Sequence, residues 1–449
     1  MVSAVRFLAF QAIEKIMDAP GVGDWDEGVH LEGPDQALFH DIVQGTLRNW
    51  RFLEKCVKSH CTRPPKRNMT YVLYTSAYQI IFYDRVPEYA VFAEAKKVAQ
   101  RIGFSPDEER FLSAVLKRIA ENKSNYRDVH EKTLERLRLG GEFQDGDLDI
   151  LNVSDDLLNL LKKGPKGSFK TVVQCLVQMK KIPAVVGIEL PSVTGDKPFE
   201  DTVLKKDSAI APLLSEYRGS SVDGSIFRVQ SETSQFSCNL FAKEIKSAFQ
   251  KGTKKIRILD VAAGKGGKLF GTLLHLYGDA NNLGPLEWVA TDRSERQLRM
   301  LRSEWENAKK NWAVAFDKLE IKSVVHDWKQ PFSSDESFDF IWLDAPCTGF
   351  GTLAKHPEIA LLRGSQPQVA VKELAELQKE MLKQSVEHLK KSGRYFYSVC
   401  TLSEAETVGQ RDYLEKLLAR KSVETRSEWV FWPGSEPAPL SEGFYLTVL

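Results

Sequence analysis

The sequence has no apolar run long enough to cross a membrane and no recognisable export signal. Its start, MVSAVRFLAFQAIEKIMD, is interrupted by Glu14 and Lys15 and lacks a small-residue cleavage site. A membrane-spanning helix needs ~20 consecutive apolar residues, and no stretch reaches that length. We therefore expect a cytoplasmic protein without a membrane partner.

Cysteine is scarce and scattered. The six thiols in 449 residues include no close pair with the spacing of a zinc site or a disulfide scaffold. They are Cys56, Cys61, Cys175, Cys238, Cys347 and Cys400. This usage fits a reducing compartment, and we expect no metal site.

An excess of charge is also missing. Lysine and arginine number 62 against 61 acidic residues, so the net charge of +1 provides no global attraction to nucleic acid. Any such partner must be met by a local basic patch. With 42% hydrophobic and 27% charged residues the chain is typical of a globular protein, and its length predicts more than one domain.

The first ~125 residues show the periodicity of helices, and strand signals are scarce there. Apolar residues recur at helical spacing from Val5 to Ile16, and two later helices are separated near Pro87. This region also carries the one strong basic cluster: Arg48, Arg51, Lys55, Lys58, Arg63, Lys66 and Arg67. Such a run is more often a solvated helix face than a nucleic-acid surface. An RNA-facing role depends on what the rest of the chain indicates.

The middle of the chain is less regular. The stretch 139–149, LGGEFQDGDLD, is rich in Gly and Asp and predicts a linker. Beyond it, SDDLLNLLKKG favours a short helix and KIPAVVGIELP a strand.

From about residue 225 short β-rich runs alternate with helical segments. The runs are IRILDV (256–261), EWVATD (287–292), LEIKSVVH (319–326), FDFIWLDAP (338–346) and GRYFYSVC (393–400). This alternation predicts an α/β fold, in which a parallel sheet is covered by helices on both faces.

Reactive side chains fall at or just past the ends of these runs: Asp260, Asp292, Asp344, Cys347 and Cys400. In parallel sheets ligands bind beyond the carboxyl ends of the strands. An isolated cysteine is more often a small core residue than a nucleophile. Two strand-end thiols, one within Asp-Ala-Pro-Cys, favour catalysis.

The first strand leads into a turn of small residues, AAGKGGK (262–268), where a ligand can approach the backbone at a helix N-terminus. The P-loop pattern fails because residue 262 is Ala and residue 269 is Leu, and the dinucleotide pattern fails because residue 269 would have to be Gly. Asp292 alone would be read as a helix cap, but a strand-end acid can also bind both hydroxyls of a ribose. The turn and the acid together predict an adenosine cofactor without a pyrophosphate, S-adenosylmethionine.

Four motifs resemble those of the RNA 5-methylcytosine methyltransferases of the Sun/Fmu type. They are RVQSETSQ (228–235), LDVAAGKGGK (259–268), DAPCTGFGTLAKHPEI (344–359) and SVCTLSEAE (398–406). The stretches LFHDIVQGTLRNWRFLEKCV and YVLYTSAYQIIFYDRVPEYAVFAEAKKVA are similar to the NusB-like helical domain of the bacterial small-subunit rRNA members. The chain departs from the family in lacking a proline in the glycine turn, in having Val399 where a threonine is usual, and in lacking an Arg-Val-Asn stretch in its middle region.

The resemblance implies methyl transfer from S-adenosylmethionine to carbon-5 of a cytosine in RNA through a covalent cysteine adduct. Cys400 would be the nucleophile, Cys347 would assist product release, and Asp344 would hydrogen-bond the base. The implied cofactor-binding residues are Ala262, Ala263, Gly264, Lys265, Gly266, Gly267, Lys268, Asp292, Asp327 and Asp344. Among the acids, Asp292 is the expected ribose ligand and Asp327 the expected adenine contact.

The expected architecture is a Rossmann-like methyltransferase domain preceded by an all-α NusB-like domain. We divide it into a NusB-like RNA-binding domain (1–138), a linker with a small mixed α/β RNA-binding subdomain (139–224) and the catalytic domain (225–449). We expect a monomer acting on rRNA. A tRNA substrate, an enzyme that methylates an amino group, and a ribosome assembly factor with weak or no activity stay open as alternatives.

Overall fold

The chain folds into two compact units. The computed structural model describes residues 2–18, 29–181, 186–189, 200–201, 215–216, 227–276, 280, 282–312, 316–332, 336–419, 427–434 and 442–449. The first unit comprises Met1–Lys162, Ser168–Lys181 and Leu353–Pro367, and the second comprises Lys163–Gly167, Ile182–Thr352 and Gln368–Leu449.

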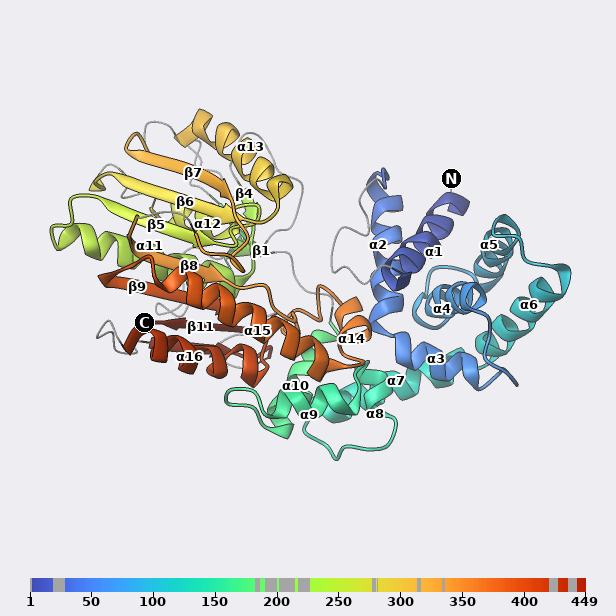
Figure 1. Ribbon diagram of the computed structural model, residues 1–449. Coiled ribbons are helices and arrows are strands. Elements are labelled where there is room, and N and C mark those ends of the chain that lie inside the picture. The colour runs from blue at the N-terminus through green and yellow to red at the C-terminus, as the bar shows by residue number, and fades with distance from the viewer. Residues whose placement is uncertain are drawn as a thin grey trace. The chain divides into compact units, whose positions relative to one another are not determined.

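The first unit is helical (Figure 1). Its helices are α1 (Val2–Asp18), α2 (Gly33–Arg48), α3 (Trp50–Lys58), α4 (Arg67–Phe82), α5 (Glu88–Arg101), α6 (Pro106–Glu121), α7 (Lys123–Arg138), α8 (Asp147–Leu151), α9 (Asp155–Lys162), α10 (Phe169–Met179) and α14 (Glu358–Leu362). The capping box of Ser105 and Glu108 satisfies backbone N–H groups at the start of α6. Pro87 precedes the first residue of α5, which confirms the break expected there.

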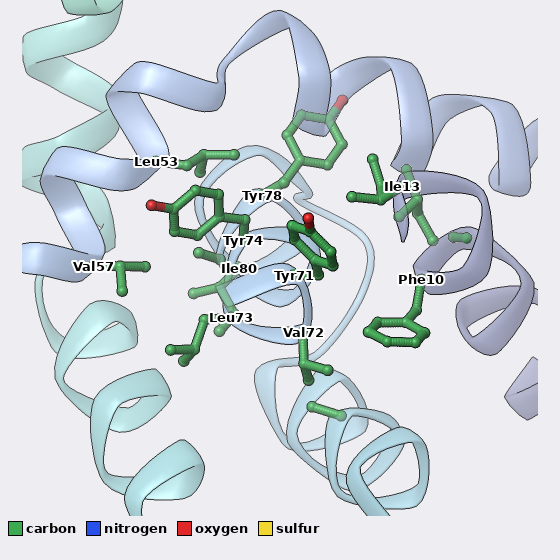
Figure 2. Close-up of a cluster of buried hydrophobic side chains, with 14 of the residues drawn as sticks. Phe10, Ile13, Leu53, Val57, Tyr71, Val72, Leu73, Tyr74, Tyr78 and Ile80 are labelled. Carbon is green, nitrogen blue, oxygen red and sulfur yellow. The ribbon is translucent and has the colours of Figure 1, made fainter. Parts of the chain in front are cut away.

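The core of this unit forms around α4. Figure 2 shows Tyr71 and Tyr74 of α4 between Ile13 of α1 and Leu53 of α3. All four side chains are at most 4% exposed. The apolar residues that recur at helical spacing therefore form one contiguous buried core, and the helical character that the sequence predicted is confirmed.

The second unit is built on a seven-stranded sheet in the order β10-β11-β9-β8-β5-β6-β7. The strands are β5 (Ile256–Val261), β6 (Leu286–Asp292), β7 (Leu319–Val325), β8 (Phe338–Asp344), β9 (Leu389–Val399), β10 (Ser427–Phe431) and β11 (Phe444–Val448). Strands β7, β6, β5, β8 and β9 are parallel and lie side by side in Figure 1. Strand β11 joins β9 in antiparallel pairing, as does β10 with β11.

Helices cover both faces of this sheet. They are α11 (Glu232–Gln250), α12 (Gly267–Leu276), α13 (Glu295–Trp312), α15 (Pro367–Val386) and α16 (Val408–Leu418). Residues of α11, α12 and α13 form one buried cluster with Trp288 and Trp342, whereas residues of α15 and α16 form another with Leu259 and Ile341. Because side chains alternate along a strand, the two clusters lie on opposite faces. The expected α/β fold, with an all-helical N-terminal region, is confirmed.

The middle region contains short strands that form a second, four-stranded sheet in the order β2-β3-β1-β4. Their bounds are β1 (Val186–Glu189), β2 (Glu200–Asp201), β3 (Ser215–Glu216) and β4 (Phe227–Val229). The helix and the strand expected here are α9 and β1. Helices α8 to α10 group with the first unit, so its boundary lies beyond the residue 138 that the sequence favoured. The RNA-binding role of residues 139–224 stays a prediction.

No helix among the described residues has the length and apolar character needed to span a bilayer.

Candidate active site

The strands that carry the predicted site residues end at one edge of the sheet. Strand β5 pairs with β6 on one side and with β8 on the other, so the strand order reverses between β5 and β8. Such a switch point opens a crevice beyond the carboxyl ends of the strands. The turn after β5 and the last residues of β6, β8 and β9 all face this edge.

The turn 262–268 contains residues in the left-handed backbone region. Ala262 and Gly264 have φ values of 61° and 58°, a region that a side chain disfavours. A Cβ added at Gly264 or Gly267 would meet no heavy atom within 4 Å. The turn thus leaves open space in front of Gly264 and Gly267 at the start of α12, while the N–H groups of Ala263, Gly264 and Gly266 are hydrogen-bonded within the protein. Lys265 within it is exposed.

Asp292 shapes this turn from the neighbouring strand. Its Oδ2 accepts a hydrogen bond from the Gly264 N–H at 3.0 Å, and its Oδ1 accepts one from the Ser294 N–H at 2.8 Å. Asp292 is not itself the helix cap, because Ser294 immediately precedes α13 and its hydroxyl accepts from the Gln297 N–H. The carboxylate is half-buried and lies where the sequence predicted it, at the end of β6.

Asp327 lies two residues past β7, whose Val325 pairs with Asp292. Its side chain is exposed, and Oδ1 accepts a hydrogen bond from the Lys329 N–H at 3.0 Å. Asp327 therefore shares the sheet edge with Asp292.

Lys268 is directed at Asp344. Its buried ammonium lies 2.9 Å from Asp344 Oδ2 and donates to the Ser234 hydroxyl at 2.8 Å. Burial alone would lower the pKa of Lys268, but the charge and hydrogen bond of Asp344, together with Cys238 and Glu442, outweigh burial and raise it. This lysine stays charged and is bound to the carboxylate at the end of β8.

A second contact fixes the other oxygen of Asp344. The Ser398 hydroxyl donates to Asp344 Oδ1 at 2.6 Å and accepts from Trp342 Nε1 at 3.1 Å. Ser398 is fully buried, whereas the Asp344 side chain is 35% exposed. The Asp344 carboxylate is thus held by Lys268 and Ser398, and its exposed part is still accessible from the crevice.

Asp260 lies behind this site with an incomplete set of hydrogen bonds. Its Oδ2 accepts from Trp288 Nε1 at 3.2 Å, and its buried Oδ1 has no hydrogen-bond partner. Burial, together with the charges of Asp344 and Asp292, raises the pKa of Asp260 to about 7. The sequence placed it at a strand end without a role.

The side chains of the two strand-end cysteines, Cys347 and Cys400, are in contact. Cys347 Sγ and Cys400 Sγ lie 3.2 Å apart, although 53 residues separate them in the chain. The hydrogen bond with Cys400 and the burial of Cys347 hold the pKa of the Cys347 thiol well above its usual value. A thiol that keeps its proton is a poor nucleophile and is suited to hydrogen-bond donation.

Sequence reasoning missed three parts of this site: the pairing of Lys268 with Asp344, the hydroxyl of Ser398, and the buried carboxylate of Glu406. Ser398 and Glu406 were inside a recognised motif, SVCTLSEAE, but nothing in the letters marks either one as buried. The described residues contain no cluster of three or more His, Cys, Asp or Glu side chains that could hold a metal ion.

Both units match known protein families. Residues 249–434 match the family described as 16S rRNA methyltransferase RsmB/F, and residues 3–121 match the NusB family. A solved structure titled "Crystal Structure of PH0851" has the same fold over the whole chain, with a TM-score of 0.62, 16% sequence identity and coverage of 98% of that protein.

Full-length relatives agree. Ribosomal RNA small subunit methyltransferase B of Shewanella oneidensis is 25% identical over 93% of this chain and 90% of the relative. The protein of the same name from Escherichia coli O6:K15:H31 is 25% identical over 99% of this chain and 98% of the relative. The resemblance that the motifs indicated is thereby confirmed along both units: residues 249–434 match the RsmB/F family of S-adenosylmethionine-dependent RNA cytosine methyltransferases, and a NusB region precedes them.

Proposed function

We propose that this protein methylates carbon-5 of a cytosine in small-subunit rRNA and that Cys400 is its nucleophile. The observation that carries the proposal is the pair of thiols 3.2 Å apart at the strand edge that also bears Asp344. The names of the full-length relatives favour small-subunit rRNA over tRNA as the substrate. Such a substrate also fits the expected cytoplasmic location.

The chemistry requires a covalent step because carbon-5 of cytosine is too weak a nucleophile to take a methyl group unaided. The Cys400 thiolate adds to carbon-6, and the electron pair of the carbon-5–carbon-6 double bond makes carbon-5 nucleophilic. After methylation carbon-5 loses its proton, the double bond forms again, and the bond from carbon-6 to sulfur breaks.

Cys347 and Asp344 assist these steps in different ways. The Cys347 S–H can hydrogen-bond the Cys400 sulfur as it leaves, since the two sulfurs lie 3.2 Å apart. Asp344 is held by Lys268 and Ser398, so its free lone pairs can meet the edge of the base near N3 and the amino group. The target cytosine must leave its stack or start unpaired to reach them.

The cofactor fits the turn 262–268. S-adenosylmethionine supplies, when bound, a methyl group on a sulfonium centre. We assign its binding to the open backbone of the turn, including Ala263, Gly264 and Gly267, with Asp292 on the ribose and Asp327 near the adenine. The space in front of Gly264 and Gly267 supports this assignment.

Asp292→Ala is expected to weaken S-adenosylmethionine binding at least ~10-fold, because one carboxylate both meets the ribose hydroxyls and holds the Gly264 N–H. Calorimetric titration of the purified protein measures the change. Asp327→Ala removes an exposed acid from the same edge and should cost less. Equal affinity in Asp292→Ala and the unchanged protein would remove Asp292 from the site.

The basic cluster of the first unit gives weaker support for RNA binding. Arg48 is buried and donates to the Ala354 carbonyl at 2.7 Å. Five other members pair with carboxylates: Arg51 and Lys55 with Asp149, Lys58 with Glu54, Lys66 with Glu108, and Arg67 with Asp18. Exposed pairs of this kind are weak, so RNA phosphates can still replace the carboxylates.

If phosphates do so, changing Arg51, Lys55 and Lys58 to glutamine should flatten the salt dependence of RNA binding, because fewer phosphates are neutralised. The slope should fall by ~0.7–0.9 for each phosphate that no longer meets a cation. Filter binding at several salt concentrations measures the slope. An unchanged slope would assign these side chains to their carboxylate partners alone.

A methyl-transfer assay followed by nucleoside mass spectrometry tests the whole proposal. Small-subunit rRNA lacking the modification should yield 5-methylcytidine, and tRNA should not. A methylated amino group, or no product on any RNA, would contradict it.

A further inference from the structure

Glu406 is a charged side chain buried beside the cysteines. It ends the short 3₁₀ helix η3 (Glu404–Glu406) and is 0% exposed, whereas Glu404 and Ala405 are exposed. Burial of a carboxylate is costly unless hydrogen-bond donors surround it. Burial raises the pKa of Glu406, and the donors that face it act in the opposite direction.

Four close donors satisfy this carboxylate, and the Thr401 hydroxyl makes a longer contact with Oε2 at 3.5 Å. Glu406 Oε1 accepts from the Thr348 N–H at 2.8 Å and from Gln378 Nε2 at 3.2 Å. Glu406 Oε2 accepts from the hydroxyls of Thr348 and Ser403, each at 2.7 Å. Two of the four are N–H groups that can only donate, so the ionised carboxylate matches its surroundings.

These bonds join the two loops that carry the thiols. Thr348 follows Cys347 in the loop after β8, and Thr401 follows Cys400 in the loop after β9. The hydroxyls of Thr348 and Thr401 lie 2.8 Å apart. Gln378 of α15 also donates to the Pro346 carbonyl at 2.9 Å, so the Cys347 loop is held on both sides of the cysteine.

We infer that Glu406 is a positioning residue that fixes Cys347 against Cys400. Its carboxylate ties residue 348 to the segment 401–406 and so sets the separation of the two sulfurs. Its effect on methyl transfer rests on the proposed roles of the cysteines, but the geometry of the thiol pair can be measured without RNA. The two ideas can therefore fail separately.

The geometry test uses phenylarsine oxide, a trivalent arsenical that binds two close thiols. Two arsenic–sulfur bonds form, both thiol protons leave with the arsenical oxygen as water, and the arsenic stays trivalent. Glu406→Gln presents an amide NH₂ to a ring of donors and loses one acceptor. We expect its affinity for the arsenical to fall at least ~10-fold. Glu404→Gln makes the same change at the exposed neighbour and should bind as the unchanged protein does, while Cys347→Ala gives the baseline.

Activity and stability complete the test. For Glu406→Gln we expect kcat to fall ~100-fold, since misplacement by ~1 Å has that effect, with KM for RNA and S-adenosylmethionine affinity within threefold. Should Glu406→Gln fold poorly, Thr348→Val removes one donor at constant volume and should lower arsenical affinity and kcat in the same way but less. Thr348→Ser keeps the hydroxyl, so its arsenical affinity and kcat should equal those of the unchanged protein. Unchanged arsenical binding in both Glu406→Gln and Thr348→Val would overturn the inference, as would losses of kcat and cofactor affinity that simply follow a lower melting temperature.

Discussion

Cys400→Ala is expected to abolish methyl transfer and to leave RNA free on a denaturing gel. Without the thiolate no bond to carbon-6 can form, so carbon-5 is never activated. The raised pKa of the Cys347 thiol suits it to keep its proton and to hydrogen-bond the neighbouring sulfur.

Cys347→Ala should fail differently. The variant can still attack and methylate, but it lacks the thiol whose sulfur lies 3.2 Å from the departing Cys400 sulfur. A protein–RNA adduct should therefore survive denaturation and appear as a shifted band. S-adenosylmethionine affinity should barely change in either variant.

Cys61→Ala is a matched control, because it removes a partly exposed thiol from the helical unit. It should be fully active and free of adduct. If Cys400→Ala traps the adduct and Cys347→Ala does not, the cysteine after Asp-Ala-Pro is the nucleophile. If both variants methylate normally, neither thiol takes part in catalysis and both are only packing residues.

Lys268→Met is expected to lower kcat at least ~100-fold, the loss typical of a preorganised charged group removed from an active site. Methionine keeps the length and apolar volume of lysine but leaves Asp344 without its buried ammonium partner. The carboxylate should then rotate away from the base edge, held by Ser398 alone. Single-turnover methylation measures the effect.

The change at Lys268 should leave S-adenosylmethionine affinity within threefold, because its ammonium bonds Asp344 and Ser234. Lys265→Met alters the exposed lysine of the same turn and serves as the control. If Lys268→Met loses turnover and cofactor affinity to the same extent, Lys268 binds the cofactor, as the sequence predicted.

Local pattern was enough to predict much of the catalytic unit. The expected strands 256–261 and 319–326 match β5 and β7 within one residue, since fully buried or alternating β-rich runs bounded by turns carry a strong signal. Strands β10 and β11 were missed. They form an antiparallel pair at the sheet edge, and antiparallel pairing lies outside the alternation of parallel strands and helices on which the prediction relied.

Contacts between distant parts of the chain could not be predicted. Lys268 and Asp344 are 76 positions apart, and their pairing depends on β5 and β8 being neighbours in the sheet. The basic cluster illustrates the reverse problem. The sequence shows its charges, but it does not show that Asp149 pairs with Arg51 or that Arg48 is buried.

The first unit is discontinuous in the chain. Residues 353–367, which include α14, belong to it but follow the cysteine loop of the other unit. Ile359 and Ala360 in this segment are buried, Ala354 accepts from Arg48, and Gly364 accepts from Ser154 at 2.6 Å.

A nascent chain therefore cannot complete its helical unit until residue 367 has left the ribosome, well after most of that unit has been synthesised. A fragment that ends at residue 181 would lack one of its own helices, and a fragment that starts at residue 225 would carry Ile359 without the residues that bury it. The two units cannot be cut apart or exchanged between relatives at a single position, so we expect them to be inherited as a pair.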